Sequence, residues 1–399
     1  MTNVATGLTV YYVTAPAPAG PPAVQVVGPW AGSEWQAFKP VLDLLTNNTG
    51  ISYQYTTSRQ EDLSTTLPIQ FQAKQSQGDL IFMPSSAIQQ YAARGWVTNL
   101  KGTIDPATYQ PGALTPVNGT NAIWGGAYTG KVKPGFWYRP SFFQAHSLQV
   151  PTTWDQFWTL LSQIKNISGV VNPILSGDGV GWPLSDVTEA FIETYGGASM
   201  HQQLTARTLS WTDPSVEAVF QNYLVKTLQA GFWSQPITWN DPGVNLWWNG
   251  SYPLYFMGSW ITGMVPDTSD LAVFALPGGV ANQGIVFAAD YFFVPMYAAH
   301  PDLGKQLAKF LSTKDAQAEA VKQGGNIATA AGVPLSDYPA IDAKVAGLLQ
   351  GKTVLPDLDD TIGNPFQTTF WSDLQPLWAT PANWQTILTA IQTAAAAQS

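Results

Sequence analysis

Stretches typical of β-strands alternate with stretches typical of amphipathic helices from residue 24 onward. The strand-like stretches are residues 24–27, 51–55 and 79–83, and the helix-like stretches are residues 33–50, 65–77 and 86–95. In the first helix-like stretch Ser33 is placed to cap the N-terminus, and apolar side chains recur three or four residues apart, so one face is expected to be buried. Strands and helices in this order favour an α/β domain built around a central sheet.

The helical pattern continues along the rest of the chain. Further helices are predicted over residues 152–165, 186–195, 215–230, 301–311, 315–323, 340–350 and 382–397. No repeat of fixed period relates these segments, so the pattern does not indicate a solenoid. A chain of 399 residues is long enough for two or three domains with a large buried core.

Charged residues make up only 11% of the chain, and 26 acidic residues outnumber 17 basic ones. So few bases argue against nucleic acid as a partner. The chain has no cysteine, and its three histidines are scattered at His146, His201 and His300, so we expect neither a metal site nor a bound cofactor. The low charge also predicts a protein that stays folded at about pH 3, because few cations are left to repel one another.

The first 23 residues are expected to form a spacer. Residues 14–23 are rich in Pro and Ala, a composition typical of an extended, semi-rigid linker. The start of the chain lacks the basic and apolar regions of an export signal, which leaves a cytosolic location as the alternative. We expect an extracellular protein anchored at the cell surface, with its export segment absent from this sequence and membrane contact only through an anchor outside it.

Four Asn-x-Ser/Thr acceptor sites support export, although one or two are expected by chance in a chain of this composition. They lie at Asn47, Asn118, Asn166 and Asn249. Glycosylation of these sites is left open by the sequence. The longest apolar region, residues 271–299, is interrupted by Pro, Gly and Asp and does not predict a membrane-spanning helix.

The sequence contains no recognisable catalytic motif. It has no Gly-x-x-x-x-Gly-Lys phosphate loop and no Gly-x-Ser-x-Gly nucleophile turn. Glu189 and Glu193 lie four residues apart on a predicted helix, and we interpret them as a solvated helix face in preference to a glycosidase pair. The protein is therefore not expected to be an enzyme.

Several tryptophans lie outside helical patterns, in segments rich in Gly, Pro, Asn and Asp. They are Trp30, Trp124, Trp182, Trp239 and Trp260. Such segments form loops or strand ends, where binding residues concentrate. An indole face can stack on the C–H face of a sugar ring while nearby acids and amides bind its hydroxyls, although ordinary packing is the alternative for each one. Four other tryptophans follow helical spacing and are assigned to packing: Trp154, Trp158, Trp371 and Trp384.

The order of eight short segments resembles the extracellular solute-binding proteins of ABC transporters, in the sugar-binding family that includes maltose- and glucose-type binders. The segments are residues 28–34, 78–83, 136–139 followed by 151–155, 181–186, 248–250 with 257–260, 289–290, 308–311 and 323–326. Each segment alone has little specificity, but together they occur in register over roughly residues 24–395.

This resemblance implies a periplasmic-binding-protein-like α/β fold with two lobes, three hinge crossovers and a ligand cleft that closes between the lobes. The crossovers are expected near residues 129–131, 287–291 and 326–332. Lobe 1 would then comprise residues 24–130 plus 290–330, and lobe 2 residues 131–289 plus 331–399.

The resemblance also implies a set of ligand-binding residues. Those expected from the first lobe and the crossovers are Trp30, Glu34, Ser85, Thr129, Asp290 and Asn326, and those expected from the second lobe are Trp182, Trp239 and Trp260. Asp290 lies in an apolar run, so its carboxylate is expected to be buried and to need donors, for which sugar hydroxyls or a backbone cap are suitable.

The function implied is that of the extracellular component of an ABC sugar importer. The protein would capture a sugar, in the first place a monosaccharide such as glucose, by lobe closure and deliver it as a monomer to a membrane permease. A secreted glycoside hydrolase and a surface adhesion module are the alternatives, because both would use the same aromatic and polar residues.

Overall fold

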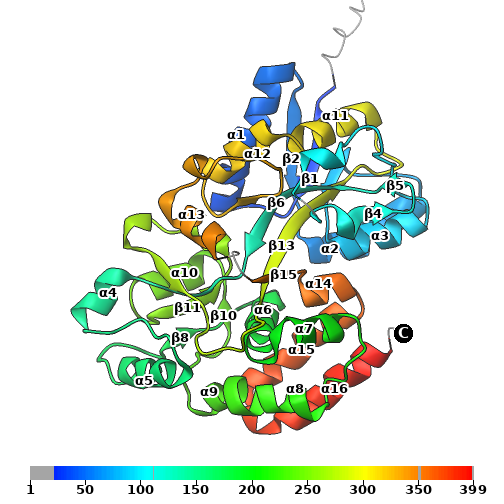
Figure 1. The fold of residues 1–399 in the computed structure, drawn as a ribbon. Helices are drawn as coiled ribbons and strands as arrows, with labels where there is room; N and C mark the ends of the chain where they lie inside the picture. Colours follow the sequence, from blue (N-terminus) through cyan, green and yellow to red (C-terminus); the bar gives the residue numbers. More distant parts are fainter. Residues whose placement is uncertain (1–21, 111, 349–351, 398–399) are drawn as a thin grey trace, which may run out of the picture.

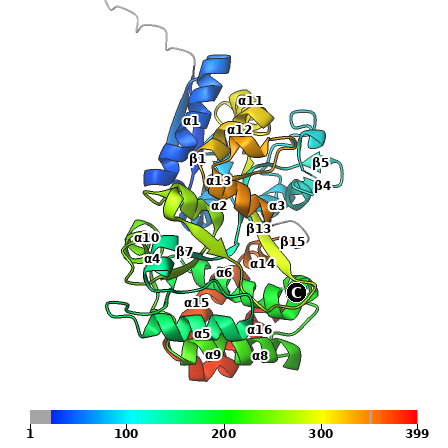
Figure 2. The ribbon, with the colours of Figure 1, turned by 60° about the vertical axis from the view of Figure 1, so that its left-hand side comes forward.

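The computed structural model describes residues 22–110, 112–348 and 352–397, and it has two lobes stacked one above the other (Figure 1). Figure 2 shows the same two lobes after a rotation, with α1 (Gly32–Thr49), α11 (Pro301–Leu311) and α12 (Lys314–Lys322) in the upper one. Helices and sheets alternate, as the sequence predicts. Residues 1–21 of the predicted spacer lie outside the described residues.

The upper lobe is built on a sheet of seven strands within the described residues. In spatial order these are β14 (Ile327–Ala328), β6 (Gly126–Val132), β13 (Gly284–Phe293), β3 (Leu80–Phe82), β1 (Val24–Gly28) and β2 (Tyr53–Thr57), with β15 (Thr353–Leu355) also paired to β13. β1 is parallel to β2 and β3, whereas β13 runs antiparallel to β3 and β6. The central strands are apolar because helices cover both faces of the sheet.

Helices of the upper lobe follow the predicted order with shifted ends. α2 (Gln60–Gln72) begins five residues before its predicted start at residue 65, and α3 (Ser85–Ala93) begins one residue early. The N-cap of α1 is Ala31, so the prediction that Ser33 caps this helix was wrong. Gly50 ends α1 in the left-handed conformation with a φ of 74°, where glycine carries no Cβ penalty.

The lower lobe surrounds a smaller sheet of four strands among the described residues. In spatial order these are β12 (Ala272–Phe274), β7 (Gly135–Tyr138), β11 (Leu254–Met257) and β8 (Ile174–Leu175). Its larger helices are α5 (Trp154–Lys165), α6 (Trp182–Phe191), α7 (Gly197–Thr205), α15 (Phe366–Ala379) and α16 (Trp384–Ala396). Thr153 and Gln156 form a capping box at the start of α5, as the sequence favours.

Shorter elements complete the architecture. Two-stranded pairs are β4 (Asn118–Gly119) with β5 (Ala122–Ile123) and β9 (Gly177–Asp178) with β10 (Ile237–Thr238). Short helices are α4 (Pro140–Ala145), α8 (Pro214–Val219), α9 (Val225–Gln229), α10 (Asp241–Trp248), α13 (Ala340–Gly347) and α14 (Leu358–Ile362). The helix predicted over residues 215–230 is divided by a π-helical turn at Phe220–Leu224. A second π-helical turn, at Ile192–Gly196, follows α6.

Each lobe has its own hydrophobic core. Buried residues of the upper core come from residues 24–128 and 292–320, and those of the lower core come from residues 136–276 and 358–395. β6 and β13 run side by side between the lobes (Figure 1). The lobe bounds predicted from the sequence stay a prediction. No helix in the described part of the chain is long and apolar enough to span a membrane.

Candidate functional site

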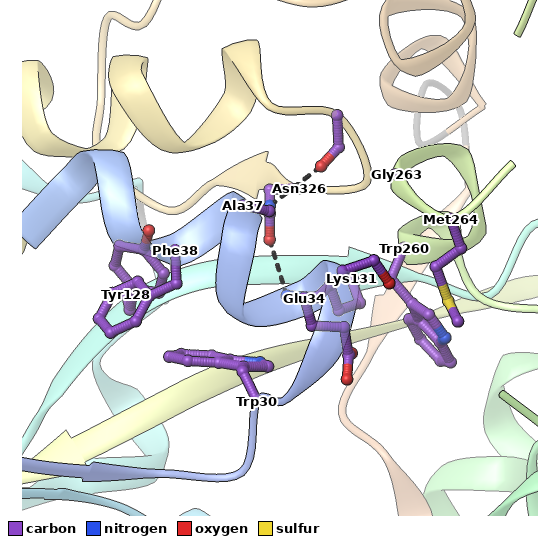
Figure 3. Close-up of a pocket in the computed structure, with 12 residues that line it drawn as sticks. Trp30, Glu34, Ala37, Phe38, Tyr128, Lys131, Trp260, Gly263, Met264 and Asn326 are labelled. Atoms are coloured by element: carbon purple, nitrogen blue, oxygen red, sulfur yellow. Dashed lines mark hydrogen bonds between the residues drawn. The ribbon is translucent and has the colours of Figure 1, made fainter. Parts of the chain in front are cut away.

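A first cavity lies where the two lobes face each other (Figure 3). Trp30 and Glu34, between β1 and the first turn of α1, line it from the upper lobe, and Trp260 and Met264 line the opposite side. Its empty volume is about 430 Å³, including open solvent at the mouth. Aromatic walls with a carboxyl group between them suit a ligand that has both apolar faces and hydroxyl groups.

Trp30 is at once a core residue and a wall of the first cavity. Its side chain is 7% exposed, and its ring centroid lies 4.5 Å from that of Phe38 and 4.6 Å from that of Phe82. The backbone N–H of Trp30 donates to Tyr55 Oη, and the Tyr55 hydroxyl donates to the Trp30 carbonyl, both at 3.0 Å. The indole is therefore fixed before any ligand arrives, which limits the entropy lost on binding.

Three half-buried tryptophans meet on the lower side. Trp182 begins α6, Trp239 follows β10, and Trp260 lies in the 3-10 turn η5 (Ser259–Gly263). The Trp182 ring centroid lies 4.9 Å from that of Trp239 and 5.4 Å from that of Trp260, in edge-to-face contacts. Within the described residues the indole N–H of Trp260 is buried and has no hydrogen-bond acceptor, an arrangement that costs free energy.

Polar groups beside the first cavity form a network around Lys131. The Lys131 ammonium donates to Asp290 Oδ2 at 2.6 Å and to Asn326 Oδ1 at 2.7 Å, and the Thr129 hydroxyl donates to Asn326 Oδ1 at 3.0 Å. The Asp290 side chain is 21% exposed, so the prediction that this carboxylate is fully buried was wrong. Lys131 supplies a donor to it, and binding of sugar hydroxyls by Asp290 stays a prediction.

Glu34 is the titratable group that faces the first cavity most directly. Its carboxyl group points into the space between Trp30 and Trp260 (Figure 3). Burial raises the pKa of Glu34 to about 7; Lys131 lowers it, while Asp290 and Asp241 raise it. The group is thus poised between its neutral and charged forms near neutral pH.

A second cavity also has walls from both lobes. Arg59 and Asp62, at the start of α2, face Gly181 and Trp371, and the empty volume is about 810 Å³ including open solvent. Gly181 immediately precedes Trp182, whose ring contacts Trp260 in the wall of the first cavity. Trp182 therefore links the walls of the two cavities, which share no lining residue.

The sequence profile of the family described as bacterial extracellular solute-binding protein matches residues 31–318. An uncharacterized ABC transporter extracellular-binding protein of Pyrococcus horikoshii is 44% identical over 359 residues, which cover 90% of this chain and 84% of that protein. The chain belongs to this family. It is the extracellular solute-binding component of an ABC transporter.

More distant solute-binding proteins are also similar to this chain in sequence or in fold. The osmoprotective compounds-binding protein GgtB of Synechocystis is 24% identical over 376 residues, which are 88% of this chain and 87% of that one. The solute receptor AcbH, described as preferring β-D-galactopyranose, superimposes with a TM-score of 0.81 at 20% identity, covering 94% of this chain and 97% of that one. RafE in complex with raffinose superimposes with a TM-score of 0.76 at 15% identity, covering 95% of this chain and 100% of that one. These structures show the two-lobe fold.

The structure of this solute-binding protein brings together most of the residues singled out from the sequence. Trp30, Glu34, Trp260 and Asn326 line the first cavity. Trp182 and Trp239 contact Trp260, and Thr129 and Asp290 bond to Asn326 and Lys131. Ser85 begins α3 and lines neither cavity. The roles of these residues in ligand binding stay a prediction.

Among the cavity residues that sequence reasoning missed are Lys131, Arg59 and Trp371. Lys131 lies two residues after Thr129 within a predicted crossover, and a lone base in an apolar strand was the available signal. Arg59 carries no such signal. Trp371 was assigned to packing, and it does pack against the lower core, but it also lines the second cavity.

The prediction that Glu189 and Glu193 form a solvated helix face was wrong. Glu189 is fully buried and Glu193 is 4% exposed. Glu189 Oε2 lies 3.0 Å from His201 Nε2 and accepts a hydrogen bond from the backbone N–H of Leu358 at 3.0 Å. Both glutamates face elements distant in sequence, which the spacing on one helix does not reveal.

Glu189 belongs to a buried group of ionisable side chains below the cleft, which we name the acidic cluster. Its members are Lys133, Asp186, Glu189, Asp357, Asp359 and Asp360. Lys133 follows β6 and donates to both Asp186 and Asp357. Carboxylates this close could hold a metal ion, but the ammonium of Lys133 already provides a positive charge between two of them.

Proposed function

We propose that this solute-binding protein captures a sugar between its lobes and delivers it to the membrane permease of its transporter. The observation that carries the proposal is the first cavity, where Trp30 from one lobe and Trp260 from the other flank the Glu34 carboxyl group. Indoles stack on the C–H faces of a pyranose, and Glu34, Asn326 and Lys131 exchange hydrogen bonds with its hydroxyl groups. A single unit such as glucose occupies this cavity.

Longer ligands reach the second cavity. Trp371 and Arg59 there provide a further aromatic and polar pair, so the cleft accepts an oligosaccharide with one unit in each cavity. Support comes from relatives of known ligand: RafE binds raffinose, and the AglE protein of Rhizobium meliloti, 25% identical over half of this chain, is named for α-glucosides. Closure about the paired β6 and β13 strands buries the sugar.

The proposed function involves no bond cleavage. Glu189 and Glu193, the acids considered for a glycosidase pair, line neither cavity. Incubation with labelled oligosaccharides is expected to leave them intact, and turnover would favour a glycoside hydrolase.

Trp260→Ala is expected to weaken sugar binding by at least about fivefold, because losing stacking and burial costs about 1 kcal/mol or more. A thermal-shift panel of sugars identifies the ligand, since any ligand of the native state raises the melting temperature. Calorimetry then measures the affinity of the variant. Trp384→Ala is the matched control, because Trp384 is half-buried on α16 and lines neither cavity. Equal effects of both variants would contradict the proposed site, and no sugar in the panel binding would favour an adhesion module.

Glu34→Gln is expected to remove a pH dependence of sugar affinity near neutrality. Hydroxyl groups that donate to the carboxylate stabilise its charged form, so the sugar lowers the pKa of Glu34 from about 7 in the free protein. The contribution of Glu34 is then present above about pH 7 and is lost as pH falls through the lower pKa of the complex. Titrations at about pH 8 and about pH 5 should differ for the wild type and agree for E34Q. Equal wild-type affinities would remove Glu34 from the site.

The surroundings of the protein are part of the proposal. It acts outside the cell, anchored at the cell surface, as a monomeric glycoprotein. The four acceptor asparagines are all exposed, which supports glycosylation: Asn47, Asn118, Asn166 and Asn249. Mass spectrometry of the native protein before and after deglycosylation, together with light scattering, tests both points.

A further inference from the structure

Trp371 is held in the wall of the second cavity from two sides. Gly181 adopts a φ of 98°, and a Cβ added to it would lie 2.6 Å from the Cβ of Trp371, so only glycine leaves room for this contact. On the other side, the indole N–H of Trp371 donates to Asp359 Oδ2 at 2.7 Å. The ring therefore has little freedom to turn, although part of it is exposed to the cavity.

Asp359 is a buried junction between three helices. Its side chain is 2% exposed, and besides Trp371 it accepts hydrogen bonds from the Ser185 hydroxyl and from Gln367 Nε2, the latter at 3.3 Å. Ser185 lies three residues after Trp182 on α6, whereas Trp371 and Gln367 lie on α15. Asp359, on α14, thus ties the wall of the second cavity to the helix that begins with Trp182, whose ring contacts Trp260 in the wall of the first cavity.

We propose that Asp359 is a positioning residue: it fixes the indole of Trp371 against Gly181 and thereby sets the affinity for sugars long enough to reach the second cavity. The ligand in this inference rests on the proposed function, whereas the position of the Trp371 ring is independent of that function. Asp359 itself is buried behind the indole and lines neither cavity.

The ionisable groups around Asp359 determine its protonation state, and therefore which substitution best mimics the native side chain. Those that act on Asp359 itself are Lys133 after β6, Glu189 on α6 and Asp357, the N-cap of α14. Asp360, on α14, is near Asp359 and is faced by Asp186 on α6 and by Tyr291 on β13, and His201 on α7 faces Asp357. Burial raises the pKa of Asp359 well above its ordinary value, and the charges of Asp357 and Glu189 raise it further. A neutral asparagine is therefore close in charge and shape to the native side chain, whereas alanine removes the acceptor.

Selective ¹⁵N labelling of tryptophan gives a ligand-free test, because the indole N–H of Trp371 can be assigned as the signal lost in Trp371→Phe. In Asp359→Ala this signal should move upfield and its hydrogen exchange should become faster, as expected for a lost hydrogen bond. Asp359→Asn should restore most of the native shift. Asp360→Ala is the matched control, because Asp360 accepts from Gln367 but has no bond to Trp371. An unchanged indole signal in D359A, or an equal change in D360A, would overturn the positioning role.

Calorimetry with glucose and maltotriose tests the consequence for binding. D359A should weaken maltotriose by about tenfold and glucose by less than about threefold, which is the loss expected when one charged or strongly polar contact is removed. W371F keeps an aromatic face but loses the N–H donor, so combining it with D359A should cost no more than either change alone. Equal losses for both sugars would overturn the assignment to the second cavity. If the wild type binds neither sugar while the indole signal responds as expected, the proposed ligand is wrong and the positioning of Trp371 stands.

Discussion

Lys133→Met should destabilise the protein by about 3–5 kcal/mol at neutral pH, because it leaves buried carboxylates without their cation. The Lys133 side chain is 4% exposed and donates to Asp186, on α6, and to Asp357, the N-cap of α14. Burial would lower the pKa of Lys133, but the charges of Asp186, Asp357 and Glu189 raise it well above its ordinary value, so the side chain is charged at neutral pH. Urea unfolding followed by circular dichroism measures the loss.

The cost of K133M should shrink in acid, because Asp186 and Asp357 can then take up protons in place of the missing ammonium. Lys39→Met is the matched control: Lys39 pairs with Asp43 at 2.6 Å, but its side chain is 45% exposed. Surface pairs of this kind contribute at most about 1 kcal/mol. A K133M protein as stable as K39M at neutral pH would show that the acidic cluster does not depend on its lysine.

The free energy of unfolding should rise by several kcal/mol as the pH is lowered from about 8 to about 4.5. Burial raises the pKa of Asp186 and of Glu193 to about 7 and that of Asp342 to about 6, and it raises those of Glu189, Asp359 and Asp360 well above their ordinary values. The folded protein therefore holds protons that the unfolded chain releases. The stability from these groups is complete below their unfolded pKa of about 4 and is lost as pH rises through their folded values.

Two kinds of group act in the opposite direction. Burial lowers the pKa of His201, so keeping this ring neutral costs free energy below about pH 6.5. Although burial opposes it, the charge of Lys133 holds the pKa of Asp357 below its ordinary value, so its contribution is lost only in strong acid. His201 and Asp357 are outnumbered by the buried carboxyl groups whose pKa is raised. Urea unfolding at about pH 4.5, 6 and 8 decides the matter, and a stability that is flat or increases with pH would contradict it.

The interior therefore gives a reason for acid tolerance that differs from the one found in the composition. A sparse surface charge predicts that the protein stays folded at about pH 3, because few cations repel one another. The acidic cluster gives a second reason: several of its carboxyl groups are protonated in the folded protein. Neither argument depends on the other, and retention of the circular dichroism spectrum at about pH 3 tests both.

The sequence was sufficient where local pattern decides the structure. α1, α5 and α11 lie close to their predicted bounds, because their apolar spacing and end signals are contained within one segment. The strand around residues 284–293 was foreseen as an apolar run with a crossover near residues 287–291, and sugar hydroxyls or the backbone were expected as the donors to Asp290. Its partner Lys131 comes from another strand 159 positions away, and no local pattern records such a pairing.

The acidic cluster shows the same limit more sharply. Glu189 and Glu193 have the spacing of a solvated helix face, and the pattern alone favours that interpretation. What buries Glu189 is Leu358, whose backbone N–H reaches it from 169 positions along the chain, together with His201. Trp371 is a related case, because helical spacing correctly places one side of it in the core and says nothing of the other side.

The strand order of the upper sheet has a consequence for how the chain is made. β13, which ends at Phe293, lies between β3 and β6, and β14 at Ile327–Ala328 forms the edge beside β6. A nascent chain that stops short of residue 284 thus carries β3 and β6 with unpaired edges and nothing to join them. The lower core is completed even later in synthesis, because it includes Phe370 and Leu388. Neither lobe can be completed by the ribosome before most of the other has been synthesised, so the protein folds late, and truncated products expose sheet edges that favour aggregation.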